Sequence, residues 1–198
     1  MIGFSRSVDF YLQFVNPTMS YVLALSGSPN KFSKTTSLLH TIARQLGIQG
    51  CELRAVHATD FGRSFTGHLI RVYLSDFGEL VRQADVIVLL TPIGNDDHPG
   101  LLAPLLELLP DGAFAEKPVL LVVTGGLPAH VAGLEQASAA ELNRLQGTLL
   151  QPPLHIGSRS WIVLGDDPPQ LTRGTEGRLA SALKNALSPR SALKGASA

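Results

Sequence analysis

The chain has one cysteine, one tryptophan and no excess of either charge. Because Cys51 is the only cysteine among 198 residues, an internal disulfide is impossible, and the composition suits a reducing compartment. The 16 Lys and Arg balance the 16 Asp and Glu, so the basic surface typical of nucleic-acid binding is not indicated. No apolar run approaches the roughly 20 residues that a membrane helix needs. We expect a cytoplasmic protein that binds neither nucleic acid nor membrane.

Two common nucleotide-binding motifs are also absent. Counted from Gly27, Lys34 comes one position too late for the NTPase motif G-x-x-x-x-G-K-[ST], and no second glycine precedes it. In the dinucleotide motif G-x-G-x-x-G, Pro29 and Phe32 stand where glycines are required. These differences exclude both motifs from the first loop of the chain.

That loop is nevertheless rich in Gly, Ser and Thr, and it joins an apolar run to a helical pattern. Backbone N–H groups at the start of a helix lack intrahelical partners, and the helix dipole favours negative charge there. Side chains that can add hydroxyl donors or positive charge are Ser28, Lys31, Ser33, Lys34, Thr35 and Thr36. The loop predicts a phosphate site of the flavodoxin-like kind. The alternative is a Ser/Thr-rich turn that only caps the helix.

Apolar segments alternate with helical patterns along the chain. We expect strands at 21–25, 51–56, 86–90, 119–123 and 161–164, and helices around 38–47, 77–81, 101–109, 131–150 and 171–187. This alternation predicts a flavodoxin-like α/β fold, a doubly wound five-stranded parallel sheet in the order 2-1-3-4-5 with helices on both faces. The domain is expected to span 19–187, with an N-terminal extension at 1–18 and a flexible tail at 188–198.

Ligands of such sheets bind beyond the carboxyl ends of the strands, so the loops after the third and fourth strands also matter. The third loop covers 91–100, and the fourth covers 124–130. Gly125 and Gly126 in the fourth loop allow the backbone to approach a flat ligand closely.

The three loops together resemble those of the NADPH-dependent FMN reductases, especially the reductase partners of two-component alkanesulfonate monooxygenases. The matching segments are Ser26-Gly27-Ser28-Pro29 with Ser33 and 35–39, Thr91-Pro92 with 100–102 and 105–110, and Thr124-Gly125-Gly126 with Ala129-His130. The resemblance covers about residues 20–186, in the size range of one domain.

The resemblance implies an NAD(P)H:FMN oxidoreductase in which the first loop, including Ser26, holds the FMN phosphate. The flavin ring would lie against Thr91, Pro92, Ile93 and Gly94, with its polar edge on Thr124, Gly125 and Gly126 near His130. NADPH or NADH would donate the hydride, and no side chain need act as an acid or base. A homodimer or homotetramer and a flavin-dependent monooxygenase partner are implied as well, whereas no metal site is expected.

The third loop departs from the family pattern. Gly94 stands where the family usually has an aromatic residue, and Asp96 and Asp97 add negative charge near the expected ring. These departures keep two alternatives open: an FMN-binding carrier or sensor without reductase activity, and a quinone or azo-compound reductase.

For several candidate residues, a role in capping a helix or filling the core is an alternative to a role in binding a ligand. Asp97 or His98 is more readily a cap for the following helix than a metal ligand. His130 either contacts flavin or caps its helix, and Trp161 is expected in the core. The helix at 101–109 is expected at a subunit interface, with burial inside one subunit as the alternative.

Overall fold

The computed structural model describes residues 20–29, 33–61, 68–93, 101–165 and 168–188, with the side chains of 68–73 left out. The expected extension at 1–18 lies outside these ranges. So does the expected tail, apart from Ser188.

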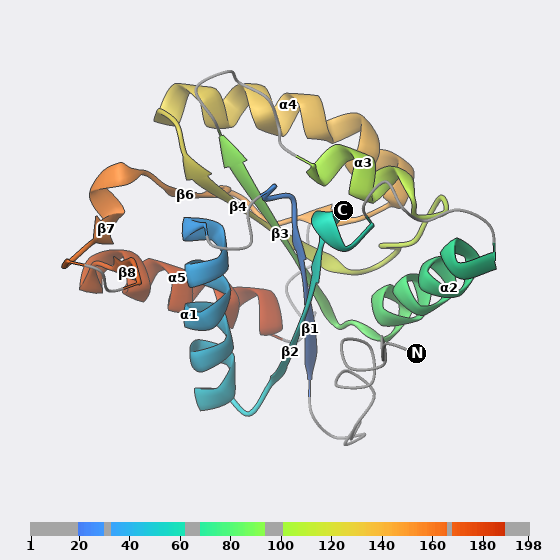
Figure 1. The fold of residues 1–198 in the computed structure, drawn as a ribbon, viewed down its shortest axis with the longest axis horizontal. Helices are drawn as coiled ribbons and strands as arrows, with labels where there is room; N and C mark the ends of the chain where they lie inside the picture. The colour runs from blue at the N-terminus through green and yellow to red at the C-terminus, as the bar shows by residue number, and fades with distance from the viewer. Residues whose placement is uncertain (1–19, 30–32, 62–67, 94–100, 166–167, 189–198) are drawn as a thin grey trace, which may run out of the picture.

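Four parallel strands form the centre of the main sheet (Figure 1). They are β1 (Tyr21–Ser26), β2 (Glu52–His57), β3 (Val86–Ile93) and β4 (Pro118–Gly125). The strand order is β2-β1-β3-β4-β5, with β6 also paired to β4. This confirms the predicted order 2-1-3-4-5, in which the chain starts near the middle of the sheet and winds outward in both directions.

Helices cover both faces of the sheet, as expected. The face formed by Val22, Ala24 and Val88 packs against α1 (Lys34–Ile48) and α5 (Arg173–Leu187). The other face packs against α2 (His68–Gln83), α3 (Leu102–Glu107) and α4 (Pro128–Leu145). Short 3-10 turns occur at Ala58–Phe61 and Ser158–Ser160. Among the described helices, none has the length and apolar character that crossing a membrane requires.

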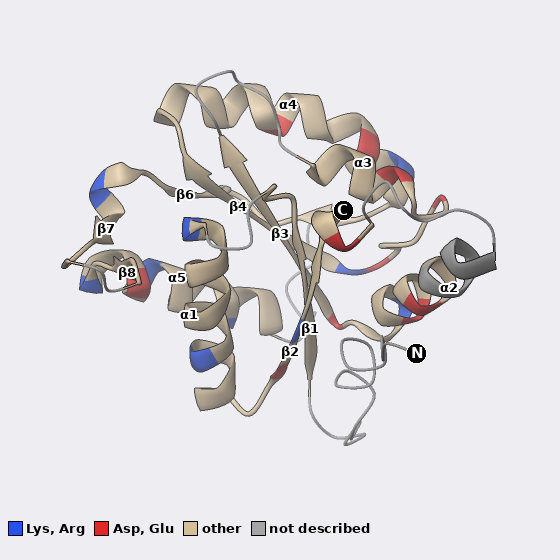
Figure 2. Cartoon of the chain, viewed as in Figure 1, with Lys and Arg blue, Asp and Glu red and all other residues tan. Residues whose placement is uncertain are grey.

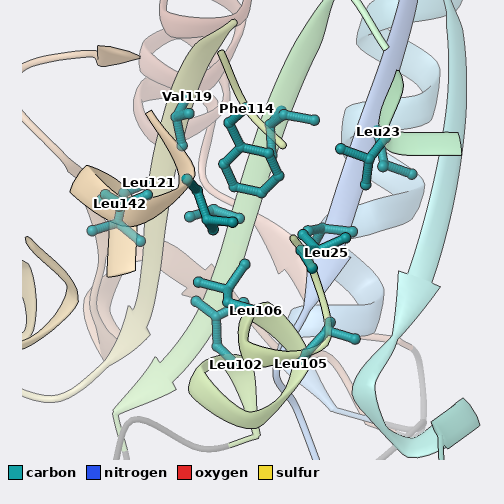
Figure 3. Packing of buried hydrophobic residues seen from close by; sticks show 14 of the residues in the cluster. Leu23, Leu25, Leu102, Leu105, Leu106, Phe114, Val119, Leu121 and Leu142 are labelled. Atoms are coloured by element: carbon teal, nitrogen blue, oxygen red, sulfur yellow. The ribbon is translucent and has the colours of Figure 1, made fainter. Parts of the chain in front are cut away.

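The core of the α2–α4 side centres on Phe114, which is fully buried. Figure 3 shows its ring among leucine and valine side chains from the strands and from α3 and α4. Leu102, Leu105 and Leu106 of α3 also point into this core. The helix expected at a subunit interface is therefore mostly buried within one subunit, and Leu101 and Leu108 are its exposed apolar residues.

The segment 161–164, predicted as the fifth strand, does not occupy the fifth position in the sheet. That position is shared by β5 (Thr148–Leu149) and β6 (Leu154–Ile156), which pair with the beginning and the end of β4. Pro152 and Pro153 lie between them, and proline has no N–H for a ladder hydrogen bond, so the strand is interrupted. The segment predicted as the fifth strand instead starts with β7 (Trp161–Ile162), which pairs antiparallel with β8 (Gln170–Leu171).

One helix prediction was wrong at its boundary. The helix expected to continue to residue 150 ends at Leu145, where Gln146 adopts a left-handed conformation. The helix α3 begins after Leu101, which makes no side-chain capping hydrogen bond, and Asp97 and His98, which were expected to cap it, lie outside the described residues. Cys51 precedes β2 and is only half-buried, and burial raises the pKa of its thiol. Trp161 is buried, as expected for a core residue.

Charged residues gather on the outer helices and the end loops, and the central strands carry few (Figure 2). Arg54 on β2 is an exception, because it is only 4% exposed. Its Nε donates to Glu52 Oε1 at 2.7 Å, and its guanidinium lies 4.8 Å from the centre of the Tyr21 ring. A buried cation needs such a partner, because desolvation of an unpaired charge is costly.

Candidate functional site

The candidate site lies where β1 and β4 end and α1 begins. Alternation along the strands places Ser26 and Thr124 on the face that α1 covers. Thr35, in the first turn of α1, places its Oγ1 3.1 Å from Thr124 Oγ1. This bond joins residues 89 positions apart, so it ties the first loop directly to the fourth.

Hydroxyl groups line the start of α1. Ser33 is the N-cap, and its side chain accepts a hydrogen bond from the Thr36 N–H. Ser33 Oγ also lies 2.9 Å from Ser28 Oγ. Within the described part of the chain, the buried Thr36 Oγ1 has no hydrogen-bond partner. Because buried hydroxyls normally find partners, this orphan group points to an additional ligand at the helix start.

Gly27 forms the junction between the first and third loops. Its N–H donates to Leu90 O at 2.8 Å, and its carbonyl accepts from Leu101 N at 2.9 Å. A Cβ at this position would lie 2.6 Å from the backbone nitrogen of Leu102. Only glycine fits there, so α3 packs directly against the loop that leads into α1.

The fourth loop requires glycine at positions 125 and 126 because its backbone packs closely against Ile93. Gly125 and Gly126 have φ values of +80° and +60°. A Cβ on Gly125 would lie 2.8 Å from Ile93 O, and one on Gly126 would lie 2.7 Å from Ile93 Cγ2. The two glycines therefore let the turn close over Ile93, in addition to any approach to a ligand.

His130 caps α4. Its Nδ1 accepts a hydrogen bond from the Leu127 N–H at 3.4 Å, which satisfies a backbone donor at the helix start. Of the two roles considered for His130, the structure therefore shows the cap.

The cap predicts a small stability effect. His130→Ala should lower the free energy of unfolding by about 0.5–1 kcal/mol, because the Leu127 N–H loses its partner. His130→Gln should retain most of that stability, since glutamine is a capping residue at this position. Urea denaturation of both variants measures the difference, and equal losses would contradict the capping role.

The structure brings together hydroxyl groups expected at the phosphate site, namely Ser26, Ser28, Ser33, Thr35 and Thr36. It also places Thr124, expected at the polar edge of the ring, against Thr35. Thr91 is fully buried, and strand alternation places it on the opposite face of the sheet from this group. Lys34 begins α1 and is exposed, and Pro92 pairs in register with Thr124. Lys31, Gly94, Asp96, Asp97 and His98 lie outside the described residues.

One residue beside the site, His155, was not predicted from the sequence. His155 on β6 places its Nε2 2.8 Å from the carbonyl oxygen of Gly125. Its segment was not assigned to the sheet at all, so only the alternation of Leu154, His155 and Ile156 could have indicated a strand there.

A comparison with protein families matches residues 20–158 to the NADPH-dependent FMN reductase family. The chain is 31% identical over 166 residues to an FMN reductase (NADPH) of Pseudomonas putida, which covers 82% of this chain and 84% of the relative. It is 30% identical over 167 residues to an FMN reductase (NADPH) of Escherichia coli, covering 82% and 86%.

The fold is similar to that of a solved NADH:FMN oxidoreductase in its apo form. The TM-score is 0.66 at 23% identity, and the match covers 85% of this chain and 88% of that one. At this identity the likeness concerns the fold alone. The family match spans more than half of the chain and includes the first, third and fourth loops. The chain therefore belongs to the NADPH-dependent FMN reductase family.

Proposed function

We propose that the protein is an NAD(P)H:FMN oxidoreductase, with FMN at the ends of β1, β3 and β4. The start of α1 holds the phosphate through its N–H groups and through the hydroxyls of Ser28, Ser33, Thr35 and Thr36. Lys31 and Lys34 add positive charge. The backbone of Thr91–Gly94 supports the ring, and Thr124–Gly126 meets its polar edge.

The residues present fit an anionic ligand at the helix start. Thr36 Oγ1 is a buried hydroxyl without a partner among the described residues, and no carboxylate takes part in the described hydroxyl contacts around it. The N-terminus of a helix supplies unpaired N–H groups and a favourable dipole for a phosphate. Bound FMN would supply the hydride chemistry, and the protein would supply binding and orientation.

The observation that carries the proposal is the bond between Thr35 and Thr124. It brings the start of α1, where we place the phosphate, next to the end of β4, where we place the polar edge of the ring. The carboxyl ends of the strands are where ligands of doubly wound sheets bind. A Ser/Thr-rich turn that served only as a helix cap would not require this second contact.

Reductase activity is tested by hydride transfer. Purified protein with FMN is expected to oxidise NADPH or NADH under air faster than free FMN does. In anaerobic stopped-flow experiments, NADPH or NADH should bleach the bound flavin. Free FMN with nucleotide, and protein without flavin, are the controls.

FMN binding without hydride transfer from either nucleotide would overturn the reductase proposal and favour a carrier or sensor. Faster reduction of a quinone or azo compound than of free FMN would identify a different acceptor within the same chemistry.

We further propose that the protein works in the cytoplasm as a homodimer or homotetramer and supplies reduced flavin to a monooxygenase. Leu101, Leu108 and Leu127 are exposed apolar side chains at or near the ends of α3 and α4. Exposed apolar side chains are candidates for a subunit contact, because covering them removes apolar surface from water. Sedimentation analysis with and without FMN measures the oligomeric state.

A further inference from the structure

The peptide between Gly125 and Gly126 joins two residues that have no side chains to fix its orientation. Both glycines have positive φ, and neither carries a side chain that restricts rotation about its backbone bonds. A peptide unit flanked by two glycines can reverse its direction at low cost. Its orientation therefore depends on what holds it from outside.

His155 holds this peptide. The strand β6 pairs with β4 so that His155 lies beside Val123, and its Nε2 reaches the Gly125 carbonyl oxygen at 2.8 Å. A carbonyl oxygen can only accept, so Nε2 must carry the proton in this contact. The backbone of His155 is itself held, since Arg178 Nη2 on α5 donates to its carbonyl at 3.3 Å.

The contact of His155 with the Gly125 carbonyl also determines the direction of the Gly126 N–H. A trans peptide is planar, so the Gly125 carbonyl and the Gly126 N–H point in opposite directions. When His155 draws the carbonyl toward β6, the Gly126 N–H is turned away from β6. A hydrogen bond to the carbonyl also strengthens the N–H of the same peptide as a donor.

We propose that His155 is a positioning residue for the flavin, and that it acts by orienting the Gly126 N–H toward the polar edge of the ring. This inference rests on the proposed function, which places that edge on Thr124–Gly126. His155 does not touch the ligand in this arrangement. It acts through the backbone of Gly125 and Gly126.

Two substitutions separate the hydrogen bond from the bulk of the side chain. His155→Phe keeps a ring of similar size and removes the donor. His155→Gln retains an amide donor at a similar distance from the backbone. His40→Phe is the matched control, because His40 is an exposed histidine on α1.

The dissociation constants of FMN and riboflavin should rise together in His155→Phe, by about threefold to tenfold, because one hydrogen bond to the shared ring is weakened. His155→Gln and His40→Phe should bind both flavins as the wild type does. A change at the phosphate loop would instead affect FMN alone. Thermal unfolding of each variant shows whether the fold is intact.

Wild-type affinities in His155→Phe, or equal losses in His155→Phe and His155→Gln, would overturn the proposal. The amide ¹⁵N chemical shift of Gly126 in the flavin-free protein provides a second measurement that needs no ligand, because it responds to a hydrogen bond at the Gly125 carbonyl of the same peptide. We expect the shift to change in His155→Phe and to stay close to the wild-type value in His155→Gln, and an unchanged shift in His155→Phe would also overturn the proposal. If the wild type binds neither flavin, the proposed function fails, and the chemical shift still decides whether His155 holds the peptide.

Discussion

The Gly27→Ala variant is expected to lose about 2–4 kcal/mol of unfolding free energy and most of its FMN affinity. The added Cβ would lie 2.6 Å from the backbone nitrogen of Leu102 and 2.7 Å from its Cβ. Relief requires the loop and α3 to separate, which strains the hydrogen bond from Leu101 N to Gly27 O. Because the same loop leads into α1, the separation also displaces the proposed phosphate site.

Gly47→Ala is the matched control for this prediction. Gly47 lies within α1, and a Cβ there would have nothing within 4 Å. Alanine in a helix is favoured over glycine, so this variant should gain up to about 1 kcal/mol. Urea denaturation and FMN titration of both variants measure the effects. If Gly27→Ala is as stable as the wild type, the close packing of α3 on the first loop is wrong.

The second large effect is the discrimination between FMN and riboflavin. FMN is expected to bind at least about tenfold more tightly, because hydrogen bonds to a charged phosphate contribute roughly 1.5–3 kcal/mol each. The start of α1 provides several such donors, and riboflavin has no phosphate to accept from them. Fluorescence titration measures the dissociation constants of FMN and riboflavin, and equal affinities would contradict the placement of the phosphate at this loop.

Thr36→Val tests the same site with a single side chain. Its Oγ1 is buried without a partner among the described residues, so its removal should leave the stability of the flavin-free protein unchanged or slightly raised. FMN affinity should fall by roughly tenfold, whereas riboflavin affinity should not change. Thr41→Val on the same helix is the control, because Thr41 Oγ1 bonds to the Ser37 carbonyl instead. A fall in riboflavin affinity as well would assign Thr36 to the ring.

Local patterns were sufficient to predict the central sheet and the hydroxyl-rich loop that leads into α1. The near-continuous apolar runs of β3 and β4 are typical of strands buried on both faces, and alternation with helices restricts the strand order. The Gly, Ser and Thr residues before α1 indicated an anion site because capping chemistry depends on near neighbours in the chain. Strand periodicity and helix capping both depend on residues that are only a few positions apart in the chain.

Other features depended on contacts between distant segments. The edge position of the main sheet is occupied by Thr148–Leu149 and Leu154–Ile156, which pair with β4. Trp161 instead lies in a separate antiparallel pair of strands. The contact of Thr35 with Thr124, and that of His155 with Gly125, joins residues 89 and 30 positions apart. The amino-acid sequence therefore predicted the strand order and the capped start of α1, because the alternation of strands with helices restricts the order and capping depends on near neighbours. Which loops meet, and which side chain holds the Gly125 peptide, was decided by tertiary packing, because these contacts exist only once the strands lie side by side.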